Sequence, residues 1–181
     1  LMIDGKLRFG AFGIAGELGH QTVQPGGPVC GCGNRGCLEA VARPPAIASA
    51  AGRTTIEEVL EGLAAGDTRC VQAVAMAAHY LGIGLANVIT MIGPDRIVIG
   101  GGVAAAGDAV LEPIRTAVRS RLTLVPPDAV EIVPASLGAE AGAIGAALSA
   151  IGSPVGEIEF LRGEIPSARI RRNEEARSAG D

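Results

Sequence analysis

Residues 17–39 read ELGHQTVQPGGPVCGCGNRGCLE, a glycine-rich stretch that carries three of the chain's four cysteines and one of its two histidines. Four possible metal donors follow one another in it: His20, Cys30, Cys32 and Cys37. Three thiolates and one imidazole form a donor set that suits tetrahedral Zn²⁺. Because four protein donors leave no open position for water, we expect the metal to organise the loop rather than to take part in chemistry.

The glycines of this stretch favour the same interpretation. Gly33 follows Cys32, and Gly36 comes directly before Cys37. Donors so close in sequence need tight backbone turns, which glycine permits because it has no Cβ. The alternatives are four unrelated small buried residues or a disulfide between Cys30 and Cys37, but thiols clustered beside a histidine fit a metal site in a reducing cytoplasm better.

The remaining cysteine and histidine have simpler explanations. Cys70 stands alone in an apolar segment, where we expect it to act as a small core residue. His79 has no neighbours of ligand type, so packing or a surface position is expected for it.

Outward from the loop, the pattern of apolar residues predicts an α/β fold. Residues 1–10 predict a β-hairpin around the Asp4-Gly5 turn. Helices are expected at residues 40–52, interrupted or restarted at Pro44, at residues 56–65 with Thr55 or its neighbour as cap, and at residues 67–92. The long helix has apolar residues at spacings of three and four, which predict a buried stripe: Val71, Val74, Ala75, Ala78, Leu81, Leu85, Val88 and Ile92.

The second half of the chain alternates strands and helices. A buried strand is expected at residues 96–99, an amphipathic helix at 107–121, a strand at 130–133 and a small-residue helix at 139–151. This alternation implies an α/β layer with parallel pairing. We therefore expect one lobe over residues 1–151 and a charged tail over residues 152–181.

Bulk composition excludes several classes of function. The net charge of −4 and the pI of about 5.2 do not favour binding to nucleic acid or to an anionic membrane. The longest candidate for a membrane span, residues 73–92, is interrupted by His79, Tyr80, Asn87 and two glycines, so no uninterrupted apolar run reaches the ~18 residues that a span needs. A cytoplasmic location is therefore expected.

Residues 13–44 resemble the signature of the ROK family of sugar kinases, regulators and related proteins. The family pattern, Ala-Gly-Glu-x-Gly-His followed by Cys-x-Cys-Gly-x-x-Gly-Cys-x-Glu, is matched at every position. The resemblance extends through PDRIVIGGGV at residues 94–103 and LGAEAGAIGAA at residues 137–147. It implies the lobe of an actin-like, ribonuclease-H-like ATPase, with a mixed sheet flanked by helices and a zinc-bound loop over residues 17–39.

By this resemblance, Glu17, His20 and Glu39 contact sugar hydroxyls. The chemistry agrees, since an ionised carboxylate can accept hydrogen bonds from two hydroxyls. His20 is expected to bind zinc through one ring nitrogen while the other faces the sugar. The resemblance also implies that Gly100, Gly101 and Gly102 line an ATP site with Mg²⁺ on the phosphates, although a tight strand-to-helix turn would explain these glycines equally well.

Three further parts of a kinase of this family do not occur in the sequence: an Asp-x-Gly-Gly-Thr phosphate loop, a catalytic Asn-Asp pair and a Gly-Thr-Gly segment. We therefore expect the chain to be the C-terminal portion of a longer protein and not to phosphorylate sugar alone. The preferred function is phosphorylation of a hexose, glucose first, by a homodimeric enzyme. A sugar-responsive repressor of the same family, which alone would involve nucleic acid, and a purely structural zinc lobe are the alternatives.

Overall fold

The computed structural model describes residues 1–126 and 128–152, which form two compact units. Among the described residues, one unit combines residues 1–16 with residues 142–152, and the other lies within Glu17–Ala141. Except for Gly152, the expected charged tail lies outside the described residues.

The N-terminal hairpin is confirmed. Strands β1 (Met2–Ile3) and β2 (Lys6–Leu7) pair antiparallel. Asp4 and Gly5 between them both have positive φ angles, 52° and 69°, which match the right-handed twist of a two-residue hairpin. Helix α6 (Ala141–Gly152) belongs mainly to the same unit and begins two residues later than expected, after the short helix η3 (Gly138–Glu140).

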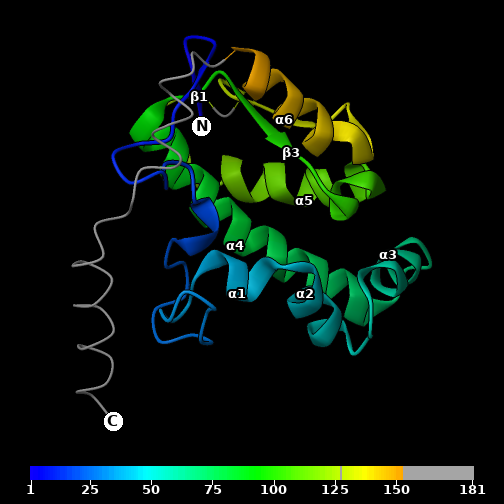
Figure 1. Cartoon of the computed structure of the whole chain (residues 1–181). Helices are drawn as coiled ribbons and strands as arrows, with labels where there is room; N and C mark the ends of the chain where they lie inside the picture. Colours follow the sequence, from blue (N-terminus) through cyan, green and yellow to red (C-terminus); the bar gives the residue numbers. More distant parts are fainter. Residues whose placement is uncertain (127, 153–181) are drawn as a thin grey trace. The chain divides into compact units, whose positions relative to one another are not determined.

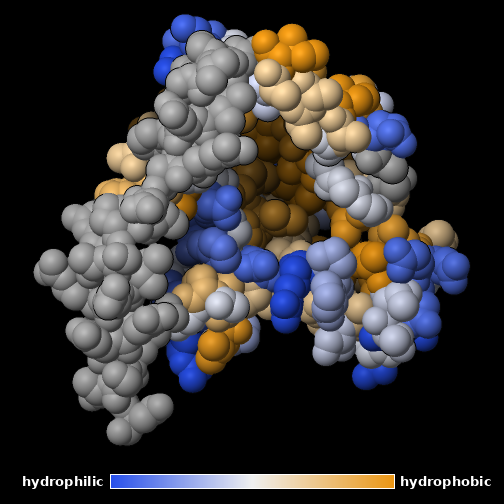
Figure 2. Space-filling model, in the orientation of Figure 1, coloured by the Kyte–Doolittle hydropathy of each residue, from blue (hydrophilic) through white to orange (hydrophobic). Residues whose placement is uncertain are grey.

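The larger unit is built around helix α4 (Thr68–Ile92). Helix α5 (Asp108–Arg119) packs along one side of α4, and α1 (Leu38–Ala42), α2 (Pro44–Ala51) and α3 (Ile56–Ala64) pack along another (Figure 1). Hydrophilic residues with some apolar ones among them cover the part of the surface where the short helices lie (Figure 2).

The ends of these helices follow the sequence signals. Pro44 occupies the first turn of α2, where its missing N–H costs nothing, so it restarts the helix after Arg43. The Thr55 side chain caps α3 by accepting from the Glu58 amide. Gly93, in the left-handed conformation at φ 61°, ends α4.

The predicted stripe on α4 is confirmed at Val74, Ala78 and Leu85, which are buried, and wrong at its other edge. Val71 and Ala75 are exposed, whereas Ala73, Ala77 and Ile89 are buried. The buried face also includes Gly82 and Gly84, which carry little hydropathy signal and were therefore not part of the expected stripe, and Cys70, which was expected in the core. By contrast, the predicted face of α5 is buried as expected, at Val110, Leu111, Ile114 and Val118, with Leu122 just beyond the helix.

Strands β3 (Arg96–Ile99) and β4 (Glu131–Pro134) confirm the expected parallel pairing, with Ile97 opposite Ile132. The prediction that β3 is fully buried is wrong, since Val98 is 57% exposed. In the described residues β3 pairs only with β4, and only alternate side chains face the core. In place of the expected single mixed sheet, the described residues form two separate two-stranded sheets, β1 with β2 and β3 with β4.

By length and composition, helix α4 is long and apolar enough to cross a membrane. This was not anticipated from the sequence, because only apolar runs without interruptions were considered. Its buried residues, among them Val74, Leu85 and Ile89, belong to the core cluster of the larger unit. The helix therefore has the contacts of a core helix.

Candidate metal and sugar site

The backbone of residues 17–39 folds back on itself, which brings distant donors together. Val23 and Gln24 both donate to the carbonyl of Gly36, at 2.8 and 3.1 Å, and Leu38 donates to the carbonyl of Gln21 at 2.9 Å. Gly36 has a φ of 71°, and a side chain there would overlap the carbonyl of Gln24. Glycine is therefore required at this crossing of the two segments.

The four predicted donors converge. Ligand atoms of His20, Cys30, Cys32 and Cys37 all lie within 4.8 Å of one another. The Cys32 and Cys37 sulfurs are 3.6 Å apart, and the Cys30 sulfur is 3.7 Å from Nδ1 of His20. No disulfide joins these cysteines, all of which lie in the described part of the chain, so the Cys30–Cys37 disulfide is not formed.

These separations fit zinc. With Zn–S bonds of ~2.3 Å and a Zn–N bond of ~2.05 Å, a tetrahedral site has S···S edges of about 3.8 Å and S···N edges of about 3.5 Å. The two separations given above lie within about 0.2 Å of those edges. The donor set therefore fits a closed tetrahedral site in chemistry, and these two edges fit it in size, while all four ligand atoms lie within 4.8 Å of one another.

Burial distinguishes the thiols of this cluster. Cys37 is fully buried, and this burial, together with hydrogen bonds that its protonated thiol donates to the Cys32 and Cys30 sulfurs, raises its pKa to about 12. The pKa of Cys32 is instead lowered, mainly by the backbone amide of Asn34. A thiol buried like Cys37 becomes a thiolate only beside a compensating positive charge, which Zn²⁺ supplies.

Two carboxylates flank His20 on this loop. Glu17 Oε2 lies 3.8 Å from Nε2 of His20, and Glu39 Oε2 lies 3.5 Å from Nδ1. The side chains of Glu17 and Glu39 are 62% and 45% exposed, so both can meet a ligand from solvent. Because Nδ1 is also the nitrogen beside Cys30, the geometry leaves Nε2 on the side of Glu17.

The three glycines expected at a nucleotide site follow the end of β3. Gly101 has a φ of 87°, and a Cβ added at Gly101 or Gly102 would meet no atom within 4 Å. The segment leads first into the short helix η2 (Gly102–Ala106), so α5 begins only after Gly107. The helix expected at residues 107–121 is thus confirmed, while a nucleotide contact at these glycines stays a prediction.

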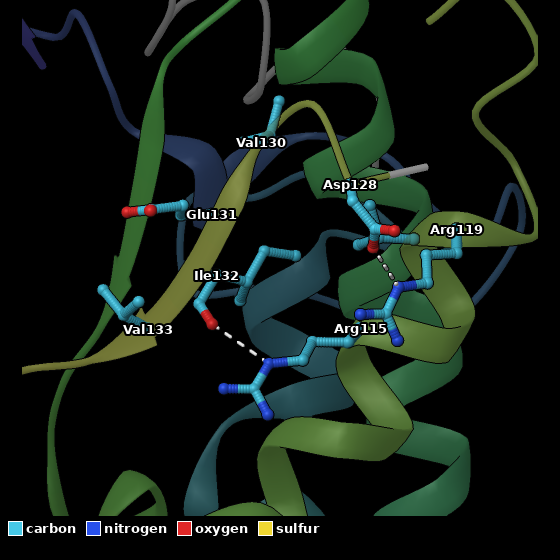
Figure 3. Close-up of a pocket in the computed structure, with 8 residues that line it drawn as sticks. Arg115, Arg119, Asp128, Val130, Glu131, Ile132 and Val133 are labelled. Atoms are coloured by element: carbon cyan, nitrogen blue, oxygen red, sulfur yellow. Dashed lines mark hydrogen bonds and ion pairs between the residues drawn. The ribbon is translucent and has the colours of Figure 1, made fainter. Parts of the chain in front are cut away.

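Sequence reasoning did not identify a cavity of about 300 Å³ between α5 and β4 (Figure 3). Arg115 donates to the carbonyl of Ile132 and pairs with Asp108, and Arg119 pairs with Asp128. Both guanidinium groups also contact Glu112. With its arginines matched by carboxylates, the cavity offers little net positive charge to a phosphate.

The two residues that were expected to be unrelated to the site are confirmed as such. Cys70 is fully buried in the core cluster. His79 is exposed, and its Nδ1 lies 3.1 Å from Arg121.

Known proteins share both sequence and fold with this chain. A glucokinase from Halalkalibacterium halodurans is 36% identical over 164 residues, covering 80% of this chain and 50% of the glucokinase. A xylose repressor from Bacillus spizizenii is 32% identical, covering 80% of this chain and 38% of the repressor. The chain thus spans about half or less of the length of these relatives.

Solved structures agree. A ROK family glucokinase from Streptomyces griseus, in complex with glucose and AMPPNP, superposes with a TM-score of 0.73 at 32% identity, over 80% of this chain and 54% of that one. A ROK hexokinase from Thermus thermophilus gives 0.67 at 39% identity, over 82% and 51%. The α/β fold is therefore that of ROK sugar kinase structures. Since residues 1–152 also match the family described as ROK, the chain belongs to the ROK family.

Proposed function

We propose that this chain supplies the sugar-binding part of an ATP-dependent hexose kinase, with glucose as the first substrate to test. The observation that carries the proposal is the arrangement of Glu17 and Glu39 on either side of His20, on a loop closed by a Cys₃His donor set. Carboxylates are strong acceptors for the adjacent hydroxyls of a hexose, and two of them fix both the position and the orientation of the ring.

Zinc has a structural role in this proposal. His20, Cys30, Cys32 and Cys37 would hold it with no open coordination position, and it supplies folding energy to a loop that has little regular structure of its own. With Nδ1 of His20 on the metal, its Nε2–H is left as a donor for a sugar oxygen.

The reaction is transfer of the γ-phosphoryl group of ATP to a hexose hydroxyl. The hydroxyl loses its proton, its oxygen forms a bond to the γ-phosphorus, and ADP leaves. Gly100 to Gly102 would contact the nucleotide, with Mg²⁺ on its phosphates. No residue of this chain is assigned as the base. A cytoplasmic homodimer is part of the same proposal.

A sugar-responsive repressor is the second candidate, because xylose repressors are among the similar proteins at 32% and 30% identity. In that case the same zinc loop would sense a sugar without phosphorylating it. Nucleotide dependence separates the two candidates, since only a kinase needs a nucleotide site beside the sugar.

Ligand-observed NMR titration of the zinc-loaded chain with glucose and xylose tests the proposal. We expect glucose binding that weakens about tenfold or more in Glu39→Gln, which keeps the shape and removes the charge. Glu57→Gln, an exposed change on α3, is the matched control and should bind glucose normally. Glucose binding strengthened by Mg²⁺ and AMPPNP supports the kinase. Xylose binding indifferent to nucleotide supports the repressor, and no binding of either sugar contradicts both.

A further inference from the structure

Gly84 on helix α4 is the point where the zinc loop and α1 meet the core. A Cβ added at Gly84 would lie 3.0 Å from Leu38 Cδ2, 3.4 Å from Leu18 Cδ1 and 3.9 Å from Val23 Cγ1. Gly82, one half-turn earlier, faces Ala117 of α5 instead. The missing side chain at position 84 therefore lets two leucines approach the α4 backbone at one place.

Each of these leucines is next in sequence to one of the two carboxylates. Leu18 follows Glu17, and Leu38 precedes Glu39. Leu38 is 3% exposed, while the side chain of Glu39 faces solvent. The two segments also touch directly, since a Cβ at Gly19 would lie 3.4 Å from Cβ of Glu39. The depth at which the leucines pack thus sets where both carboxylates lie.

His20 lies beside both carboxylates, and the Cys30 thiol donates to Glu39 Oε2 at 3.3 Å. The zinc ligands nevertheless fix this geometry only in part. They hold the backbone at His20 and Cys37, whereas Glu17 lies three residues before the first and Glu39 two residues after the second. Helix α4 adds one further link on the same side, because Asn87, three residues after Gly84, donates to the side chain of Gln21 at 3.5 Å.

We propose that Gly84 is a positioning residue for sugar binding: by admitting Leu18 and Leu38 to the α4 backbone, it sets the relative positions of Glu17 and Glu39. The inference rests on the proposed function, since it assigns these carboxylates to a sugar. Alanine at position 84 would push the flexible end of Leu38 away by a few tenths of an ångström. Alanine also favours a helix more than glycine does, so the fold itself should tolerate the change.

The test compares Gly84→Ala with the unsubstituted chain and with Gln72→Ala, a change at an exposed position three turns earlier on α4. Glucose affinity is measured by NMR titration, zinc content by elemental analysis and stability by thermal unfolding. Gly84→Ala should keep one zinc and an unchanged or higher Tm while glucose binding weakens about three- to tenfold, because small displacements of binding groups are costly. Gln72→Ala should match the unsubstituted chain in all three measurements.

A second variant separates positioning from general damage. In Gly84→Ala combined with Leu38→Val, the shorter side chain makes room for the new methyl group, and glucose affinity should recover at least in part. Unchanged glucose affinity in Gly84→Ala overturns the inference. Parallel loss of zinc and glucose also overturns it, because Gly84 would then only support the metal loop. Absence of glucose binding in the unsubstituted, zinc-loaded chain instead contradicts the proposed function, and the positioning role fails with it.

Discussion

Replacing Cys37 and Cys70 separately by alanine should separate metal binding from packing. Both side chains are fully buried, so each substitution removes one sulfur atom from a packed environment. By packing alone each should cost about 1 kcal/mol, similar to the loss of one buried methylene. Only Cys37 belongs to the donor cluster, however. Its loss should weaken zinc binding at least a hundredfold, which at saturating zinc removes roughly a further 2.7 kcal/mol.

Chemical unfolding with excess zinc, and again with a chelator, measures both contributions. With zinc, Cys37→Ala should be about 3 kcal/mol less stable than Cys70→Ala, or somewhat less if packing losses differ. With chelator, the two variants should become nearly equal, since neither then gains from metal. A difference between the variants that is the same in zinc and in chelator would refute the reasoning, because metal would then contribute nothing to the loop.

Three further predictions concern the loop and the core. Gly36→Ala should abolish stoichiometric zinc binding by elemental analysis, because its Cβ would overlap the Gln24 carbonyl; normal zinc content would show that the crossing is not needed. Ile114→Ala, in the core, should lower the free energy of unfolding, measured with denaturant, by about 2–5 kcal/mol, while the chain still binds one zinc ion. Loss of zinc would contradict the separation of core and loop. Asp67 accepts from the Arg69 and Cys70 amides at the start of α4, and chiefly the Cys70 amide lowers its pKa. The contribution of the Asp67 carboxylate to stability is therefore present above pH ~4 and is lost as the pH falls through the lowered pKa. Asp67→Ala should accordingly lower the Tm by a few degrees at pH 7 but not at pH 2. A difference in Tm that does not change with pH would contradict this prediction.

Local signals explain what could be predicted from the sequence. The cap at Thr55, the helix end at Gly93 and the convergence of His20 with the cysteines depend on short-range chemistry, and the structure confirms each. The burial of β3 was wrong because a run of apolar residues does not reveal how many strands flank it.

Features that depend on tertiary contacts were not visible in the sequence. Gly84 carries no hydropathy signal, so its contact with Leu38 appears only when α1 and α4 are seen packed together. Likewise, spacing predicted His20 as a ligand but could not say which nitrogen faces the thiols; the fold places Nδ1 beside Cys30. Both features arise from segments that are distant in the sequence.

X-ray absorption at the zinc edge of the purified chain tests the central claim most directly. The account predicts one tightly bound zinc with three sulfur neighbours at about 2.3 Å and one nitrogen neighbour at about 2.0 Å. That coordination should be unchanged on addition of glucose, since the metal has no open position. Material purified without chelators that contains no zinc, or a first shell dominated by oxygen, would contradict it.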